Sequence, residues 1–186
     1  MRHSKQAPQV NAGSTADIAF LLLIFFLVTA VIPNDQGINR KLRRICPPGQ
    51  NCTIDIHERN ILRIAINGNQ EIMLNDDIVS VDDIKELSKT FLDNNGDKSC
   101  EYCKGQGLSE SSDNPKEAVI SLQTDNETRY NLFVKVQDEL TNAYYELRAN
   151  YGQQKYGKTP DELTLEELRI VREAYPFLVS EATTKQ

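Results

Sequence analysis

An unbroken apolar run near the N-terminus limits what this chain can form more than any other feature. The run IAFLLLIFFLV occupies Ile18–Val28, and apolar character continues with one threonine as interruption to Ile32, directly before Pro33. A helix extended back to residue 14 would contain nineteen residues and measure about 28 Å, close to the thickness of a bilayer's hydrocarbon core. We therefore predict a short tail over 1–13 and a single transmembrane helix over 14–32.

An acidic residue, Asp17, lies inside this predicted helix. An ionised Asp at the middle of a membrane helix costs on the order of 3 kcal/mol, and its short side chain reaches the interface poorly. We therefore expect the carboxyl group to face protein or water. The residues on the same side of the helix, which we expect to face a partner, are Gly13, Ser14, Phe20, Leu21, Ile24, Val28 and Val31. An alternative places Asp17 at the headgroups as a first-turn acid that the helix dipole favours.

The composition of the chain excludes several functional classes. Its 21 Lys and Arg residues against 27 Asp and Glu residues give a net charge of −6, whereas a nucleic-acid binder carries a basic face. A mean hydropathy of −0.49 excludes a protein with many membrane spans. No catalytic triad, phosphate-binding loop, dinucleotide-binding glycine motif or zinc-protease motif occurs at usable spacing, and His57 stands alone in a polar stretch. We therefore predict no enzyme activity, no cofactor, no metal site and no nucleic-acid partner.

The polar remainder of the chain has the patterns of a small α+β domain. ILRIAI over 61–66 alternates with the two-residue period of a strand, and an Asn-Gly-Asn turn signal separates it from apolar residues at 72–74, which predicts a hairpin. Residues 118–122 are expected to form another short strand. Residues 177–179 are a candidate for a closing edge strand.

Helices are predicted between and after these strands. Ser80 followed by Asp83 is a variant of the capping box and predicts a helix start. The apolar stripe that follows consists of Val81, Ile84, Leu87, Phe91 and Leu92. Residues 130–151 repeat apolar side chains at spacings of three and four, as a long amphipathic helix does. Thr159 and Thr164 are competing starts for a last helix, which ends at Tyr175-Pro176.

Four cysteines form two pairs that are close in sequence, Cys46 with Cys52 and Cys100 with Cys103. Three pairings are possible, and the sequence does not choose among them. Local disulfides would suit an oxidising compartment. A zinc site made by all four thiolates and a redox-active C-x-x-C remain as alternatives.

The segment PQVNAGSTADIAFLLLIFFLVTAVI, residues 8–32, resembles the N-terminus of the ExbD/TolR family, the small subunits of proton-driven bacterial envelope motors. Residues 61–74 are similar to the hairpin that opens the family's periplasmic domain, and residues 116–139 to its later strand and helix. The resemblance implies that Asp17 is the family's intramembrane acid, which carries protons. It also implies a ring of an ExbB/TolQ-like multi-pass protein, a second copy of the chain and a TonB- or TolA-like protein as partners.

The resemblance also divides the chain. It implies a linker over 33–56 and a periplasmic domain over 57–150. Where the family's domain closes, this chain continues, and we predict a C-terminal helical extension over 151–186. Residues 94–115 are an insertion relative to the family. The expected fold class is therefore α+β, with one N-terminal transmembrane helix before the domain.

The resemblance and the cysteines favour a cytoplasmic N-terminus and a periplasmic body at the bacterial inner membrane. The basic cluster that follows the span, Arg40, Lys41, Arg43 and Arg44, would by charge alone favour the reverse, but long domains translocate largely regardless of charge. Two other functions are considered beside the motor. One is a passive single-span anchor that presents a binding domain, and the other is a secreted domain whose N-terminus is a cleaved signal peptide.

Overall fold

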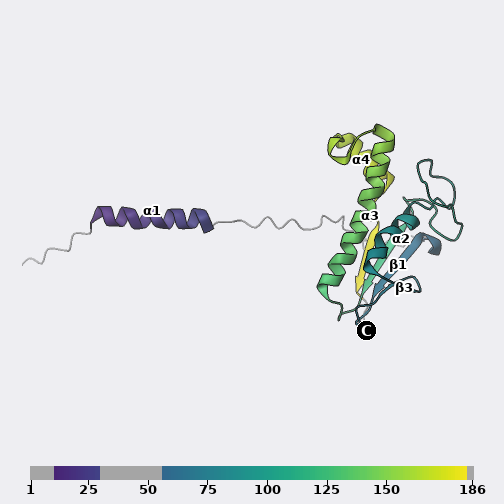
Figure 1. The fold of residues 1–186 in the computed structure, drawn as a ribbon, viewed down its shortest axis with the longest axis horizontal. Coiled ribbons are helices and arrows are strands. Elements are labelled where there is room, and N and C mark those ends of the chain that lie inside the picture. The colour runs from purple at the N-terminus through teal and green to yellow at the C-terminus, as the bar shows by residue number, and fades with distance from the viewer. Residues whose placement is uncertain (1–10, 30–55, 184–186) are drawn as a thin grey trace, which may run out of the picture. The chain divides into compact units, whose positions relative to one another are not determined.

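The computed structural model describes residues 11–29 and 56–183, which belong to two compact units. The first unit contains one described helix, α1 (Ala12–Thr29), drawn in purple in Figure 1. Asn11 caps its start, because the Gly13 N–H donates to Asn11 Oδ1 at 3.0 Å. No residue of α1 is buried by the described part of the chain.

The helix begins two residues before the predicted start at Ser14 and is regular to its last described residue. Its final hydroxyl group, on Thr29, donates to the carbonyl oxygen of Phe25 at 2.7 Å, so this polar side chain is satisfied within the helix. The remaining predicted residues, 30–32, lie outside the described part of the chain, as do most of the residues of the predicted linker.

The second unit, which we call the sheet domain, is described over residues 56–183. Its sheet has the order β3-β2-β1-β4-β5, in which β1 pairs antiparallel with β2, β2 antiparallel with β3, and β4 runs parallel to both β1 and β5. The strands are β1 (Ile61–Ile66), β2 (Ile72–Leu74), β3 (Asp77–Val79), β4 (Val119–Thr124) and β5 (Val179–Thr183).

Three α-helices and three 3-10 helices complete the described part of the domain. The α-helices are α2 (Ile84–Leu92), α3 (Tyr130–Tyr156) and α4 (Leu165–Ala174), and the short 3-10 helices are η1 (Glu58–Asn60), η2 (Val81–Asp83) and η3 (Pro160–Glu162). Figure 1 shows α2 and α3 lying against one face of the sheet. The expected α+β class, with an N-terminal apolar helix ahead of a small sheet domain, is confirmed.

The alternation seen in β1 explains how the sheet buries one face. Leu62, Ile64 and Ile66 are buried, while Arg63 between them is exposed, as a strand with one covered face requires. The same alternation continues in β4, where Ile120 and Leu122 are buried, and the covering helices complete the core. The main core residues outside β1 are Ile72, Ile84, Leu92, Ile120, Leu122, Val136, Leu140 and Tyr144.

The predicted stripe on α2 differs from the observed one at one turn. Leu87 remains 38% exposed, whereas Ser88 is fully buried. Ser88 lies between Ile84 and Leu92 on the ridge that packs toward α3, where a small side chain allows the two helices to approach closely. The capping box predicted at Ser80 is present, with Asp83 as its acidic partner.

The C-terminal segment, predicted as a helical extension over 151–186, also contains a strand that pairs with the sheet of the domain. The helix predicted to reach about residue 151 continues to Tyr156, where Gly157 adopts a left-handed conformation and ends it. Both predicted starts of the last helix are used, for η3 and for α4 in turn. After α4, β5 pairs with β4 and forms one edge of the sheet; it starts at Val179 rather than at residue 177.

The segment predicted as an insertion is fixed to the end of α2 by one buried side chain. The Asn94 amide donates from Nδ2 to the carbonyl oxygens of Leu108 and Ser112, both at 2.8 Å, and accepts from the Leu108 N–H at 3.0 Å. Asn94 is only 2% exposed. Since all three bonds come from one buried amide, this loop is an ordered part of the domain.

Candidate functional site

The acid predicted as the functional residue lies in the N-terminal third of α1. Asp17 is the sixth residue of the helix and is its one charged residue. At 1.5 Å per residue it lies about 7.5 Å along the axis from the first residue, with twelve residues following it. Among the described residues, α1 is the one helix long and apolar enough to cross a membrane, with a mean hydropathy of 2.0.

The face of Asp17 is apolar on its C-terminal side, and the described part of the chain offers the carboxyl group no partner. Because α1 is a regular helix, the residues predicted to share its face do so: Gly13, Ser14, Phe20, Leu21, Ile24 and Val28. Phe20 and Leu21 are 60% and 59% exposed, and Ile24 is 40% exposed. This face therefore combines one carboxyl group with bare apolar surface, which only lipid, water or another protein chain can cover.

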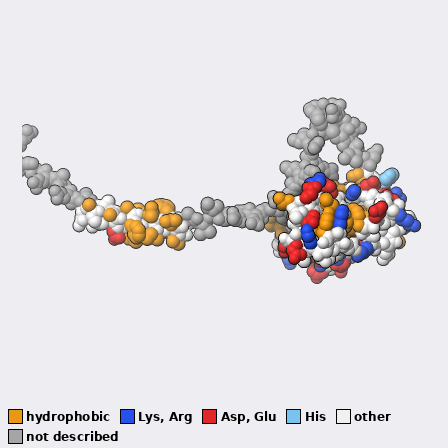
Figure 2. Space-filling view, turned by 90° about the horizontal axis from the view of Figure 1, so that it is seen from above, with side chains coloured by type: hydrophobic (Ala, Val, Ile, Leu, Met, Phe, Trp, Pro, Cys, Tyr) orange, Lys and Arg blue, Asp and Glu red, His pale blue; other side chains and the backbone are white. Residues whose placement is uncertain are grey.

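The two described units differ in surface chemistry. Figure 2 shows hydrophobic side chains over most of the visible surface of α1, and charged side chains of both signs spread over the visible face of the sheet domain.

Within the described residues, no three His, Cys, Asp or Glu side chains are arranged to hold a metal ion, and His57 is exposed. A shallow groove of about 470 Å³ on the domain has a mixed lining that includes Arg59, Arg63, Asp76 and Phe91.

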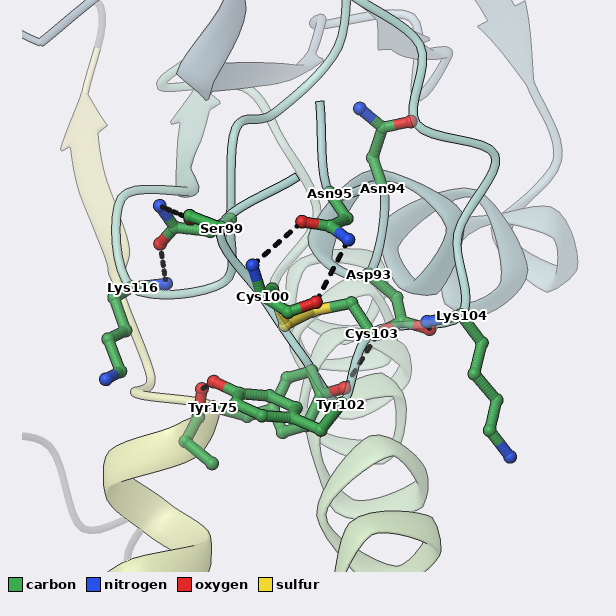
Figure 3. The surroundings of a disulfide bond; sticks show 12 residues. Asp93, Asn94, Asn95, Ser99, Cys100, Tyr102, Cys103, Lys104, Lys116 and Tyr175 are labelled. Atoms are coloured by element: carbon green, nitrogen blue, oxygen red, sulfur yellow. Dashed lines mark hydrogen bonds between the residues drawn. A yellow bond between two sulfur atoms is a disulfide. The ribbon is translucent and has the colours of Figure 1, made fainter. Parts of the chain in front are cut away.

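Cys100 and Cys103 are joined by a disulfide in the loop that follows α2 (Figure 3). The two sulfur atoms are bonded to each other, so in this oxidised form neither is a thiolate that could bind zinc, and the structure does not have the four-thiolate zinc site. Cys46 and Cys52 lie outside the described residues. The loop is anchored by the amide of Asn95, which accepts from the N–H of Cys100 and donates to its carbonyl oxygen, each at 3.0 Å.

Tyr102, inside the disulfide loop, belongs to a tyrosine cluster with Tyr151 of α3 and Tyr175 after α4. Its ring centroid lies 4.7 Å from that of Tyr151 and 5.5 Å from that of Tyr175. Burial raises the pKa of Tyr102 to about 12, so the phenol stays protonated and donates to the carbonyl oxygen of Ala174 at 2.8 Å. The three tyrosines are far apart in sequence, and no local pattern pointed to the cluster.

Tyr175 connects the tyrosine cluster to the end of α2 through a hydrogen bond to Asp93, the residue that follows this helix. Its hydroxyl group donates to Asp93 Oδ1 at 2.7 Å. Burial, together with this bond and the negative charge of Asp93, raises the pKa of Tyr175, which keeps it a donor. The guanidinium group of Arg148 donates twice to the Tyr175 carbonyl oxygen, from Nε at 2.9 Å and from Nη2 at 2.7 Å.

A second sequence-distant contact, also missed by the sequence, fixes the start of β1. The carboxylate of Asp113, which is 4% exposed, meets the Arg59 guanidinium group through both oxygens: Nη2 lies 2.9 Å from Oδ1, and Nε donates to Oδ2 at 3.1 Å. Asn60 Nδ2 also donates to Oδ2 at 2.9 Å, and Asn60 Oδ1 accepts from the Asp113 N–H at 2.7 Å. Oδ2 thus accepts two hydrogen bonds, while Oδ1 has an ion-pair contact with Arg59 but no hydrogen bond among the described residues. These contacts hold a buried carboxylate in place and make it structural.

Together these features define a class of protein: a membrane protein in which the described residues contain one candidate span, with a single acid in it, and a separate small α+β domain. The family model described as Biopolymer transport protein ExbD/TolR matches residues 3–149. The chain belongs to the ExbD/TolR family and is thus a subunit of a biopolymer transport motor, which confirms the resemblance in the sequence. The comparison with curated proteins gave no match. Since the family match ends at residue 149, α4 and β5 lie beyond the matched residues.

Proposed function

We propose that this chain is the small subunit of a motor driven by the proton-motive force, in which Asp17 couples proton flow to movement of α1. The observation that carries the proposal is the position of Asp17: it is the one charged residue of a predominantly apolar helix, in a chain of the ExbD/TolR family. A carboxyl group in such a segment is expensive, and an intramembrane acid is by default a functional residue.

The mechanism depends on alternation between two environments. In a dry helix interface the neutral acid is favoured over the carboxylate, and on contact with water or a polar group the charge is restored. One proton that crosses a membrane potential of 100 mV releases about 2.3 kcal/mol. Several protons per cycle therefore supply enough free energy to rotate or shift the helix, and the domain passes this movement on.

The partners in this proposal are those that the ExbD/TolR family implies. A single helix cannot enclose its own acid, so the face of Asp17 needs a cover, which the family supplies as a ring of a multi-pass protein of the ExbB/TolQ type together with a second copy of the small subunit. The sheet domain contacts a TonB- or TolA-like protein that spans the periplasm. The N-terminus is cytoplasmic and the domain periplasmic, at the inner membrane of a bacterium; the Cys100–Cys103 disulfide supports an oxidising compartment for the domain.

Replacement of Asp17 by Asn tests the proposal directly. Asp17→Asn keeps the size and polarity of the side chain but removes its titration, so we expect at least a tenfold loss of energised outer-membrane uptake with unchanged protein abundance. Asp77→Asn, at an exposed position of β3, is the matched control and leaves uptake unchanged. Full uptake in cells that carry only Asp17→Asn contradicts the mechanism.

A passive anchor is the second candidate. It is favoured by the distance of Asp17 from the helix start, about 7.5 Å, which is within reach of a headgroup region. In that case α1 holds the domain at the membrane, the domain binds its partner without energy input, and Asp17→Asn has no effect on uptake.

A further inference from the structure

The disulfide loop and the C-terminal segment share one set of contacts. Cys100 and Cys103 enclose only Glu101 and Tyr102, and the Tyr102 side chain reaches the last carbonyl group of α4, on Ala174. Figure 3 shows Tyr102 beside Tyr175, below the disulfide. The chain continues from Tyr175 into β5, so the position of Tyr102 bears directly on how residues 165–183 are held.

The two ends of this loop are anchored without the disulfide. Asn95 holds the backbone of Cys100 on one side, and on the other the Lys104 N–H donates to Asp93 Oδ2 at 3.0 Å. Gly105 also donates to the Asp93 carbonyl oxygen at 2.9 Å, and a Cβ atom at residue 105 would lie only 2.1 Å from that oxygen. The bond between the sulfur atoms therefore constrains mainly the two enclosed residues.

A disulfide that closes so short a loop removes little chain entropy from the unfolded state, so its effect on global stability is small. Its effect on Tyr102 is large by comparison, because the loop directs this ring against Tyr151 and Tyr175. Loss of the bond releases a side chain that contributes two ring contacts and one hydrogen bond to the C-terminal segment.

We propose that the Cys100–Cys103 pair is a site of reversible thiol–disulfide exchange, and that its oxidised form holds α4 and β5 on the sheet domain. The reactant is a protein dithiol. One of its thiolates attacks the sulfur of Cys103, which is the more exposed of the two cysteines, since Cys100 is 8% exposed. The Sγ–Sγ bond breaks, a mixed disulfide forms, and Cys100 leaves as a thiolate that takes up a proton.

The second thiol of the reactant then attacks its own sulfur in the mixed disulfide. Cys103 is released as a thiolate and takes up the second proton, and the reactant becomes a disulfide. Two electrons have moved from the reactant to the cysteine pair, and the reverse sequence with a protein disulfide restores the bond. The proposal does not rest on proton flow through Asp17.

Amide hydrogen exchange on the full-length protein in detergent tests this proposal. The background carries Cys46→Ser and Cys52→Ser, so that only Cys100 and Cys103 respond to reductant. With 5 mM dithiothreitol as the dithiol probe, we expect the pair to be reduced and exchange over residues 165–183 to become at least tenfold faster. Exchange in β1 (Ile61–Ile66) stays unchanged, because the core is not involved.

Two variants separate the role of Tyr102 from that of the sulfur atoms. In the oxidised protein, Tyr102→Ala gives the same fast exchange over residues 165–183, whereas Tyr130→Ala, at a tyrosine that is 78% exposed, leaves it unchanged. Three results would each overturn the proposal: a pair that dithiothreitol does not reduce, exchange over 165–183 that is the same in both redox states, or equal acceleration in β1. None of these readouts depends on transport, so their failure is distinct from failure of the proposed motor function.

Discussion

Carboxyl groups in the sheet domain and in α1 are in opposite situations. Asp113 is buried, and Arg59 and Asn60 pair with it within the chain, both donating to Oδ2. Asp17 lies on a predominantly apolar helix and has no hydrogen-bond or ion-pair partner in the part of the chain that the structure describes. A carboxylate with donors of its own stabilises a fold, whereas one without them depends on something outside the chain. This difference separates the structural acid from the candidate functional acid.

The largest expected effect comes from replacing α1 as a whole. If α1 only anchors the domain, any apolar helix of eighteen residues can replace it. We expect a Leu/Ala helix of that length to abolish energised uptake, with a loss of at least tenfold, and the same helix with an Asp restored at position 17 to recover a measurable part of it. The measurement is uptake in cells with matched abundance of the protein in the membrane.

Both outcomes of the replacement are informative. Full uptake with the plain Leu/Ala helix would establish the passive anchor. If uptake is lost both with the plain helix and with the helix that has Asp restored, then side chains on the face of Asp17, such as Phe20 and Ile24, also contribute to packing against the partner ring.

A second prediction contrasts the two acids through the stability of the domain. Asp113→Ala leaves the buried amide of Asn60 without its main acceptor and removes the charge opposite Arg59, so we expect a loss of about 2–3 kcal/mol. Urea unfolding of the full-length protein in detergent, followed by tyrosine fluorescence, measures this. The chain has seven tyrosines and no tryptophan, and every tyrosine lies between residues 102 and 175, so the signal reports on the sheet domain.

Two controls complete this contrast. Asp138→Ala, at an exposed position of α3, changes the unfolding free energy by less than about 0.5 kcal/mol. Asp17→Asn leaves it unchanged, because α1 belongs to the other compact unit. A loss of domain stability on Asp17→Asn would show that the two units depend on one another and would weaken the comparison.

The same contrast explains what the sequence could predict. Asp17, the apolar helix, the first hairpin and the cap at Ser80 depend on neighbours within a few residues, so their patterns are visible in the chain. The Asn60–Asp113 contact joins residues 53 positions apart, and the tyrosine cluster joins three separate segments, so neither leaves a local pattern. β3 was not predicted, because three residues at the sheet edge are too few to show a period.

The smallest predicted effect concerns an acid that is intermediate between Asp113 and Asp17, because it is paired within the chain but partly exposed. Glu146 of α3 is half-exposed and pairs with two lysines of α2: Oε1 lies 2.9 Å from Lys85 Nζ, and Oε2 lies 2.7 Å from Lys89 Nζ. Hydrogen bonds from Lys85 and then Lys89 hold the pKa of Glu146 below its ordinary value. The pairing therefore stabilises the fold above the unfolded-state pKa, about 4.3, and this contribution is lost as the pH falls through the lower folded-state pKa.

Between pH 7 and pH 3 we expect the wild-type domain to lose about 0.5 kcal/mol more stability than Glu146→Gln, since solvent screens a half-exposed pair. Asp138→Asn on the same helix should follow the wild-type pH profile, and 1 M NaCl should reduce the difference for Glu146→Gln. Identical pH profiles for wild type and Glu146→Gln at low salt would contradict the predicted contribution. A carboxylate held by two lysines at the surface would then stabilise the domain no more than an uncharged amide, and the structural role of acids here would be confined to buried sites such as Asp113.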